Sequence, residues 1–126
     1  MTLKRLEQYR SLVQEIKELG QQLSNQQIES DTVKGSLTEY PYIETTVTIR
    51  GLNTKIIERL RRRQTKLMME RLAIERYIDS IDDSLTRRVI NLRYVQGYGW
   101  HKLARNIGGN TADSLRMLVV RHVRGF

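Results

Sequence analysis

The sequence has no cysteine among its 126 residues and only one proline, Pro41. The missing cysteines exclude disulfide bonds and thiolate metal sites. No apolar run approaches the roughly 18 residues of a membrane span. The first residues, Met1-Thr-Leu-Lys-Arg-Leu-Glu, lack the apolar core of a signal peptide. We therefore expect a cytoplasmic protein that does not enter a membrane.

Residue types for catalysis are also scarce. His101 and His122 are the only histidines, they lie far apart in the chain, and no carboxylate pair stands near them. The glycine pairs lack the lysine and the strand of a phosphate-binding loop, and no Ser/His/Asp set has an interpretable spacing. We expect no enzyme, no metal and no cofactor.

Three carboxylates, Asp79, Asp82 and Asp83, are close enough in sequence to suggest a divalent-metal cluster. They stand where a long predicted helix joins the next one. Ser84 or Asp83 can cap that next helix by accepting a hydrogen bond from its first free N–H groups. Capping is the favoured interpretation.

The formal charge of +8 is unevenly distributed. Residues 1–49 contain five basic and seven acidic residues, whereas residues 50–126 contain 17 basic and seven acidic ones. Within 84–126, Asp113 is the only acidic residue beside eight Lys and Arg. Such a surface attracts a polyanion, although a solvated surface that only keeps the protein soluble has the same composition.

Residues 84–126 read as three short helices. The first, about 85–94, carries its apolar residues on one helical face: Leu85, Val89, Leu92 and Val95. The second, 100–107, does the same with Trp100, Leu103, Ala104 and Ile107.

A glycine turn separates the second and third of these helices. Gly108-Gly109 ends the second, because glycine adopts a positive φ without a Cβ clash. Asn110 is the expected N-cap of the third, with Asp113 closing a capping box, and this helix runs to about Arg124. Two helices joined by a glycine turn, the second of them cationic, are typical of helix-turn-helix proteins that read the DNA major groove.

The stretch from Arg88 to Gly108 resembles region 4 of bacterial sigma-70-type factors. The matching positions are Leu92-Arg93-Tyr94, Gly97, Trp100, Leu103-Ala104 and Gly108. The turn Gly108-Gly109-Asn110-Thr111 is one residue longer than in that family. With the longer turn, the core face of the last helix consists of Leu115, Leu118 and Val119.

The resemblance implies two sets of DNA contacts. The start of the last helix would contact bases through Thr111, Ala112, Asp113 and Arg116. Arg116 would donate two hydrogen bonds to guanine, and Ala112 would meet a thymine methyl. Asp113 either caps its helix, which we favour, or accepts from cytosine. Backbone contacts would come from His101, Lys102, Arg105, Arg121 and Arg124.

The first two thirds of the chain predict two long amphipathic helices, about 3–28 and about 52–80. Gly20 occupies one slot of the first apolar stripe. Neither helix can bury its stripe alone, so we expect a helical hairpin, a homo-oligomer in which a dimer is favoured, or both. The seam residues are Leu6, Val13, Ile16, Leu60, Leu67, Ile74 and Ile81.

The second helix also carries a cluster of cations. Arg59, Arg62, Arg63 and Lys66 share one side of it. They form either a solvated surface, which is the default, or a contact to a DNA backbone.

Residues 30–51 are the least regular segment and predict an ordered connector. Ile43, Thr45, Val47 and Ile49 alternate with polar residues, which favours a short strand. The elements Asp31-Thr-Val-Lys-Gly-Ser and Tyr40-Pro-Tyr resemble a segment of small phage proteins. Together with the sigma-like part, they make the chain similar to the ArpU-type phage transcription regulators, a family tied to late gene control.

The sequence therefore predicts an all-α protein with a helical hairpin or coiled coil in residues 1–83 and a helix-turn-helix domain in residues 84–126. The resemblance implies a sequence-specific regulator of phage or prophage genes that binds double-stranded DNA. Two alternatives stay open. One is a phage small terminase subunit that recognises packaging DNA, and the other is an interaction protein that binds RNA polymerase.

Overall fold

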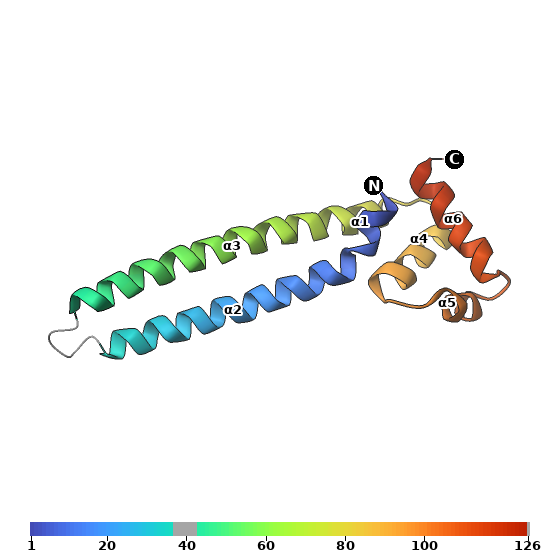
Figure 1. The fold of residues 1–126 in the computed structure, drawn as a ribbon. Coiled ribbons are helices and arrows are strands. Elements are labelled where there is room, and N and C mark those ends of the chain that lie inside the picture. Colours follow the sequence, from blue (N-terminus) through green and yellow to red (C-terminus); the bar gives the residue numbers. More distant parts are fainter. Residues whose placement is uncertain (37–42, 126) are drawn as a thin grey trace. The chain divides into compact units, whose positions relative to one another are not determined.

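The computed structural model describes the backbone of residues 1–36 and 43–125 and the side chains of residues 1–26 and 54–125. Within these ranges the chain contains helices and turns and no strand (Figure 1), which confirms the all-α prediction. No helix in the described part of the chain is long and apolar enough to cross a membrane. The elements are α1 (Leu3–Glu7), α2 (Tyr9–Ser36), α3 (Ile43–Asp79), α4 (Ser84–Ile90), the π-helical turn η1 (Asn91–Val95), α5 (Trp100–Ile107) and α6 (Ala112–Arg124).

The chain divides into two compact units. The head unit contains Met1–Val13 together with Glu70–Phe126, and the hairpin unit contains Gln14–Met69. These units do not follow the expected boundary at residues 83 and 84, because the first 13 residues and the end of α3 from Glu70 onward group with the C-terminal helices. Leu6 shows why, since its side chain is 0% exposed inside the head unit.

The first predicted helix, 3–28, is interrupted. Thr2 caps α1 by accepting a hydrogen bond from the Arg5 amide at 3.2 Å. The chain turns at Gln8, and α2 begins at Tyr9 and continues to Ser36. The interruption lies between two buried side chains, Leu6 and Tyr9.

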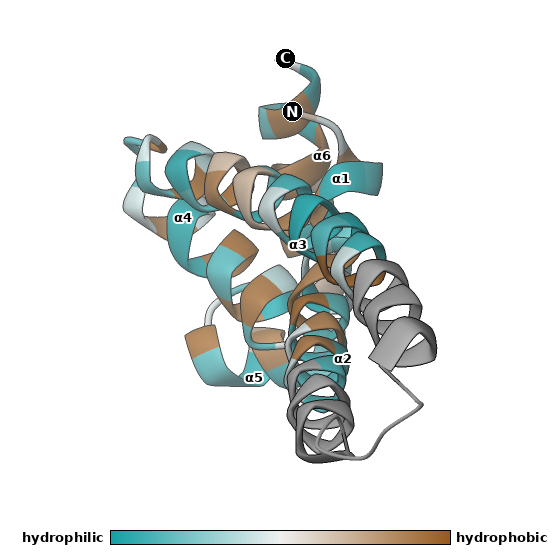
Figure 2. Cartoon of the chain, turned by 90° about the vertical axis from the view of Figure 1, so that its left-hand side faces the viewer, coloured by the Kyte–Doolittle hydropathy of each residue, from teal (hydrophilic) through white to brown (hydrophobic). Residues whose placement is uncertain are grey.

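In the hairpin unit α2 and α3 run antiparallel (Figure 1), and hydrophobic and hydrophilic residues occupy different sides of the helices (Figure 2). Gly20 is half-buried, and a Cβ added at this position would lie 3.6 Å from Nε2 of Gln64 on α3. Leu12 and Leu19 are buried although the predicted seam omitted them. Of the predicted seam residues, Val13 is half-buried and the others are buried: Leu6, Ile16, Leu60, Leu67, Ile74 and Ile81.

The predicted strand at residues 43–49 is wrong, because these residues form the first turns of α3. The irregular connector is likewise wrong for residues 30–36 and 43–51, which are helical. A lone strand would have no neighbour to satisfy its backbone, whereas a helix pairs its own N–H and C=O groups. Residues 37–42, which include Pro41, lie outside the described residues.

A short hydrogen-bond network joins the start of α2 to the end of α3 in the head unit. The Tyr9 hydroxyl donates to Oε1 of Glu75 at 2.6 Å, and Nε of Arg71 donates to the same oxygen at 3.0 Å. The hydrogen bond from Tyr9, followed by the one from Arg71, lowers the pKa of the Glu75 carboxyl. The carboxylate form is therefore the one that the fold stabilises.

We expect Glu75→Gln to be less stable than the wild-type chain at neutral pH and equal to it in acid. Because the pKa of Glu75 is lower in the folded state, its contribution is present above the usual glutamate pKa and is lost as pH falls through the folded value. At pH 7 the deficit should be about 1 kcal/mol. Urea unfolding of both proteins between pH 7 and pH 3 checks this. A deficit that persists unchanged in acid would contradict it, and Tyr9→Phe, which retains Glu75, should show a smaller deficit.

Candidate nucleic-acid interface

Helix α4 starts from a capped end. Oδ2 of Asp83 accepts hydrogen bonds from the amide and the hydroxyl of Thr86, at 3.0 and 2.5 Å. These bonds, the hydroxyl first, lower the pKa of the Asp83 carboxyl. The prediction of a cap at this helix start is confirmed, and of the two candidates, Ser84 and Asp83, it is Asp83 that caps the helix.

A π-helical turn follows α4 where a continuous helix to residue 94 was expected. The amide of Gln96 donates to the carbonyl of Asn91 at 3.0 Å, five residues back. The Tyr94 side chain is buried there and meets the edge of the Trp100 ring at 84°, with ring centroids 6.5 Å apart. The turn thus connects η1 to the first residue of α5 through an aromatic pair.

Arg93 also contacts the residues that join η1 to α5. Its guanidinium lies 5.0 Å from the centroid of the Trp100 ring, and Nη1 donates to the carbonyl of Tyr98 at 3.0 Å. The sigma-like residues Arg93, Tyr94 and Trp100 therefore position the start of α5.

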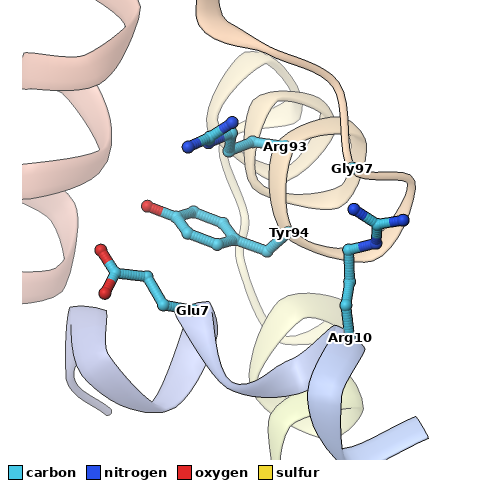
Figure 3. Close-up of a pocket in the computed structure, with 5 residues that line it drawn as sticks. All are labelled: Glu7, Arg10, Arg93, Tyr94 and Gly97. Carbon is cyan, nitrogen blue, oxygen red and sulfur yellow. The ribbon is translucent and has the colours of Figure 1, made fainter. Parts of the chain in front are cut away.

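The N-terminal helices support this turn as well. Figure 3 shows the Tyr94 ring between Glu7 and Arg93, with the Arg10 guanidinium beside Gly97. Gly97 has a φ of 82°, and a Cβ there would lie 2.5 Å from Cζ and 2.8 Å from Nε of Arg10. Sequence reasoning missed Glu7 and Arg10, because no local pattern places residues 7 and 10 next to residue 97.

The turn between α5 and α6 is built on two glycines with positive φ, 74° at Gly108 and 70° at Gly109, as predicted. The predicted N-cap is wrong by one residue. Oγ1 of Thr111 accepts from the amide of Ser114 at 3.1 Å, while Asn110 donates to the carbonyl of Gly108 at 3.4 Å.

The shifted cap has two consequences. Asp113 occupies the second position of α6 and does not close a capping box, so its carboxylate is not used in holding the helix start. The longer turn also leaves Leu115 and Val119 buried and Leu118 half-buried, while Ser114 is exposed. The predicted core face of this helix is confirmed.

The predicted base-contacting residues gather around one surface hollow of about 420 Å³, and His101, a predicted backbone contact, lines the same hollow. Thr111, Asp113 and Arg116 are exposed, and Ala112 is half-buried. Asp113 and Arg116 face each other at 4.0 Å with side chains 92% and 58% exposed, so the pair is loose. The hollow is lined by Trp100, His101, Thr111, Ala112, Asp113 and Arg116.

The other predicted backbone contacts lie outside this hollow. Nζ of Lys102 stands 4.4 Å from the centroid of the Tyr98 ring, which restrains it at the first turn of α5. Arg121 and Arg124 are exposed near the end of α6, about 15–20 Å along the helix from its cap by the 1.5 Å rise per residue. Arg105 is exposed on α5.

Met117 is a residue that sequence reasoning overlooked. It follows Arg116, lies one turn after Asp113, and is 42% exposed on α6. The sequence signal for it was its position four residues after Asp113, because residues four apart lie on the same side of a helix. Met117 does not line the hollow, so what relates it to the predicted base-contacting residues is its place on the same side of α6 as Asp113. His122, in contrast, packs against the Tyr77 ring at 6.0 Å and has a structural role.

We expect Gly97→Ala to destabilise the protein more than Gly109→Ala does. Both positions have a positive φ, which costs an alanine about 1–2 kcal/mol. Only at Gly97 would the new methyl also displace a side chain, since a Cβ at Gly109 meets nothing within 4 Å. The additional loss should be small, because the displaced group is the flexible end of the exposed Arg10 side chain. Thermal unfolding of the two variants, with and without Arg10→Ala, checks the prediction. The extra loss at Gly97 should disappear in the Arg10→Ala background, and an unchanged gap would rule out Arg10 as its cause.

Comparison of the chain with protein-family models, with curated proteins and with solved structures gives no match. The likeness to sigma-70 region 4 and to ArpU-type regulators therefore depends on the residues of this chain alone. The geometry around α5 and α6 is the basis on which a function can be assigned.

Proposed function

We propose that this protein is a sequence-specific double-stranded DNA-binding regulator of transcription, with α6 as its recognition helix. The observation that carries the proposal is the exposed start of α6, which shares an open hollow with the start of α5. Recognition helices of helix-turn-helix proteins present their first residues to base edges in this way. The assignment to phage or prophage genes comes from the resemblance to ArpU-type regulators.

The charge of the segment supports a polyanionic ligand. Asp113 is the only acidic residue in 84–126, against eight Lys and Arg. Neutralising phosphates with such cations releases counterions and provides affinity without sequence preference. Lys102, Arg105, Arg121 and Arg124, with His101, would then fix the orientation of the protein on the duplex.

Base selection is assigned to the start of α6. Arg116 is exposed and only loosely held by Asp113, so its guanidinium is available for two hydrogen bonds to guanine. Because Thr111 performs the capping, Asp113 is free to accept from a cytosine amino group. The Thr111 hydroxyl accepts the cap bond and retains its proton for donation to a base or a phosphate.

A homodimer is part of the proposal, because dimeric readers gain specificity from two half-sites. The apolar seam that suggested an oligomer is buried within one chain, so a dimer would need another surface. On α3 of the hairpin unit, Met68 and Met69 are 47% and 62% exposed. These adjacent methionines are the candidate dimer contact.

Replacing two arginines of α6 should separate base reading from backbone binding. Arg116→Ala should weaken binding to the selected DNA site by about 1–3 kcal/mol and relax its preference over random DNA. Arg121→Ala should weaken binding to both DNAs alike. It should also reduce, by about one, the steepness with which the logarithm of the binding constant falls with the logarithm of the salt concentration. Selection of a site from a random duplex library, followed by titrations at several salt concentrations, provides the measurement. Equal losses on both DNAs for Arg116→Ala would make it a phosphate contact, and a wild-type chain that selects no site would favour the RNA polymerase-binding alternative.

Sedimentation of the full chain at micromolar concentration should give a dimer, and Met69→Glu should shift it toward monomer because a buried charge opposes association. Arg59→Glu, an exposed change on a different side of the same helix, is the control, because nine residues separate it from Met68 and correspond to half a rotation. A ring of about eight or more subunits would favour a small terminase instead. A monomer would remove the two-half-site model and leave the reading helix unaffected.

A further inference from the structure

The hairpin unit contains a second surface hollow, with a volume of about 480 Å³. Its floor comes from two facing helices, Leu19 of α2 and Leu60 of α3, whose side chains form part of the apolar seam. Its rim is formed by four exposed cations of α3: Arg59, Arg62, Arg63 and Lys66.

Helical spacing explains the cluster. Relative to Arg59, the other three cations follow at three, four and seven positions, which places all four on the same side of α3. Arg61 does not line the hollow, because two residues correspond to a rotation of about 200° around the helix. The run of three arginines in the sequence therefore divides into two that face the hollow and one that does not.

The cations of the rim are weakly neutralised. Nη2 of Arg63 pairs with Oε1 of Glu15 at 3.5 Å, but both side chains are well exposed, so the pair contributes little. Arg62 donates through Nε to the carbonyl of Glu58 at 3.4 Å, which neutralises no charge. Among the described side chains, Arg59, Arg62 and Lys66 have no carboxylate within 4.0 Å.

We propose that this hollow binds an acidic peptide segment of a partner protein, with one apolar side chain seated on Leu19 and Leu60 and its carboxylates on the rim. A leucine floor favours a ligand that brings apolar surface, because removing that surface from water supplies the affinity. The cations select the sign of the flanking charges and speed the encounter. The expected ligand is an acidic segment with one apolar residue near its centre.

A nucleic acid fits the hollow less well. A phosphodiester backbone would pair with the rim, but it has no apolar side chain to cover the leucine floor. Such a contact would also depend on the total positive charge of α3, including Arg61, because phosphates line a duplex at regular intervals. The peptide proposal instead requires the particular side of the helix on which Arg59 stands. The proposed site is separate from the DNA-reading residues of α5 and α6, and it gives the regulator a protein partner.

The test uses the full chain and three fluorescein-labelled synthetic peptides. They are identical acidic 12-residue sequences whose central residue is Leu, Phe or Ser, and binding is followed by fluorescence anisotropy. The Leu and Phe peptides should bind saturably, and the Ser peptide about tenfold more weakly. Arg59→Glu should lower the affinity for the Leu peptide at least about tenfold. Arg61→Glu makes the same change in net charge outside the hollow and should alter that affinity by less than about twofold.

Several outcomes would overturn the proposal. They are no saturable binding by the Leu or Phe peptide, equal affinity of the Ser peptide, and equal losses in Arg59→Glu and Arg61→Glu. Random-sequence duplex DNA provides a further arm. If Arg59→Glu lowers the affinity for the duplex and leaves the affinity for the Leu peptide unchanged, the hollow is a phosphate-backbone contact. Arg116→Ala should not change peptide binding, so a failure of the DNA-reading assignment remains distinguishable from a failure of this site.

Discussion

The structure depends on the need to cover the apolar stripe of α3, which no single helix can bury by itself. In the hairpin unit α2 covers it, and in the head unit the first 13 residues help to cover its last turns, where Ile74 and Ile78 are buried. The Tyr9 hydroxyl on Glu75 adds a directional bond to this packing, since apolar burial alone tolerates sliding. The position of Glu7 and Arg10 follows from that packing.

This support extends to the proposed DNA-reading surface through a chain of contacts. Arg10 lies over Gly97, and Arg93 and Tyr94 meet Trp100, the first residue of α5. Helix α5 in turn packs against α6, whose Leu115 and Val119 are buried. The residues on which the resemblance to sigma region 4 was based thus hold the start of α5 in place, while the residues that we propose to read DNA are exposed at the start of α6.

Much of the fold could be predicted from the sequence, because its signals are local. Helical periodicity located α5 and the core face of α6, and Gly108-Gly109 marked the turn between them. The cap was misplaced because Asn110 and Thr111 are both good N-cap residues, and only the backbone conformation decides between them. The alternation at residues 43–49 misled because it contains β-branched residues that fit a strand. The support from Glu7 and Arg10, and the hollow at Leu19 and Leu60, depend on residues distant in sequence, and no local pattern encodes such pairs.

The head unit is assembled from the two ends of the chain, and this affects how the protein is made. Glu7 and Arg10 are synthesised well before the turn at Gly97, which follows roughly 90 residues later and corresponds to on the order of ten seconds of translation. During that interval the packing of the head unit is incomplete, and such long-range closure slows folding. A chain that stops before α6 would lack the buried Leu115 and Val119 as well as the residues that we propose to read DNA. Incomplete translation products would therefore lack both part of the head-unit core and the proposed reading surface.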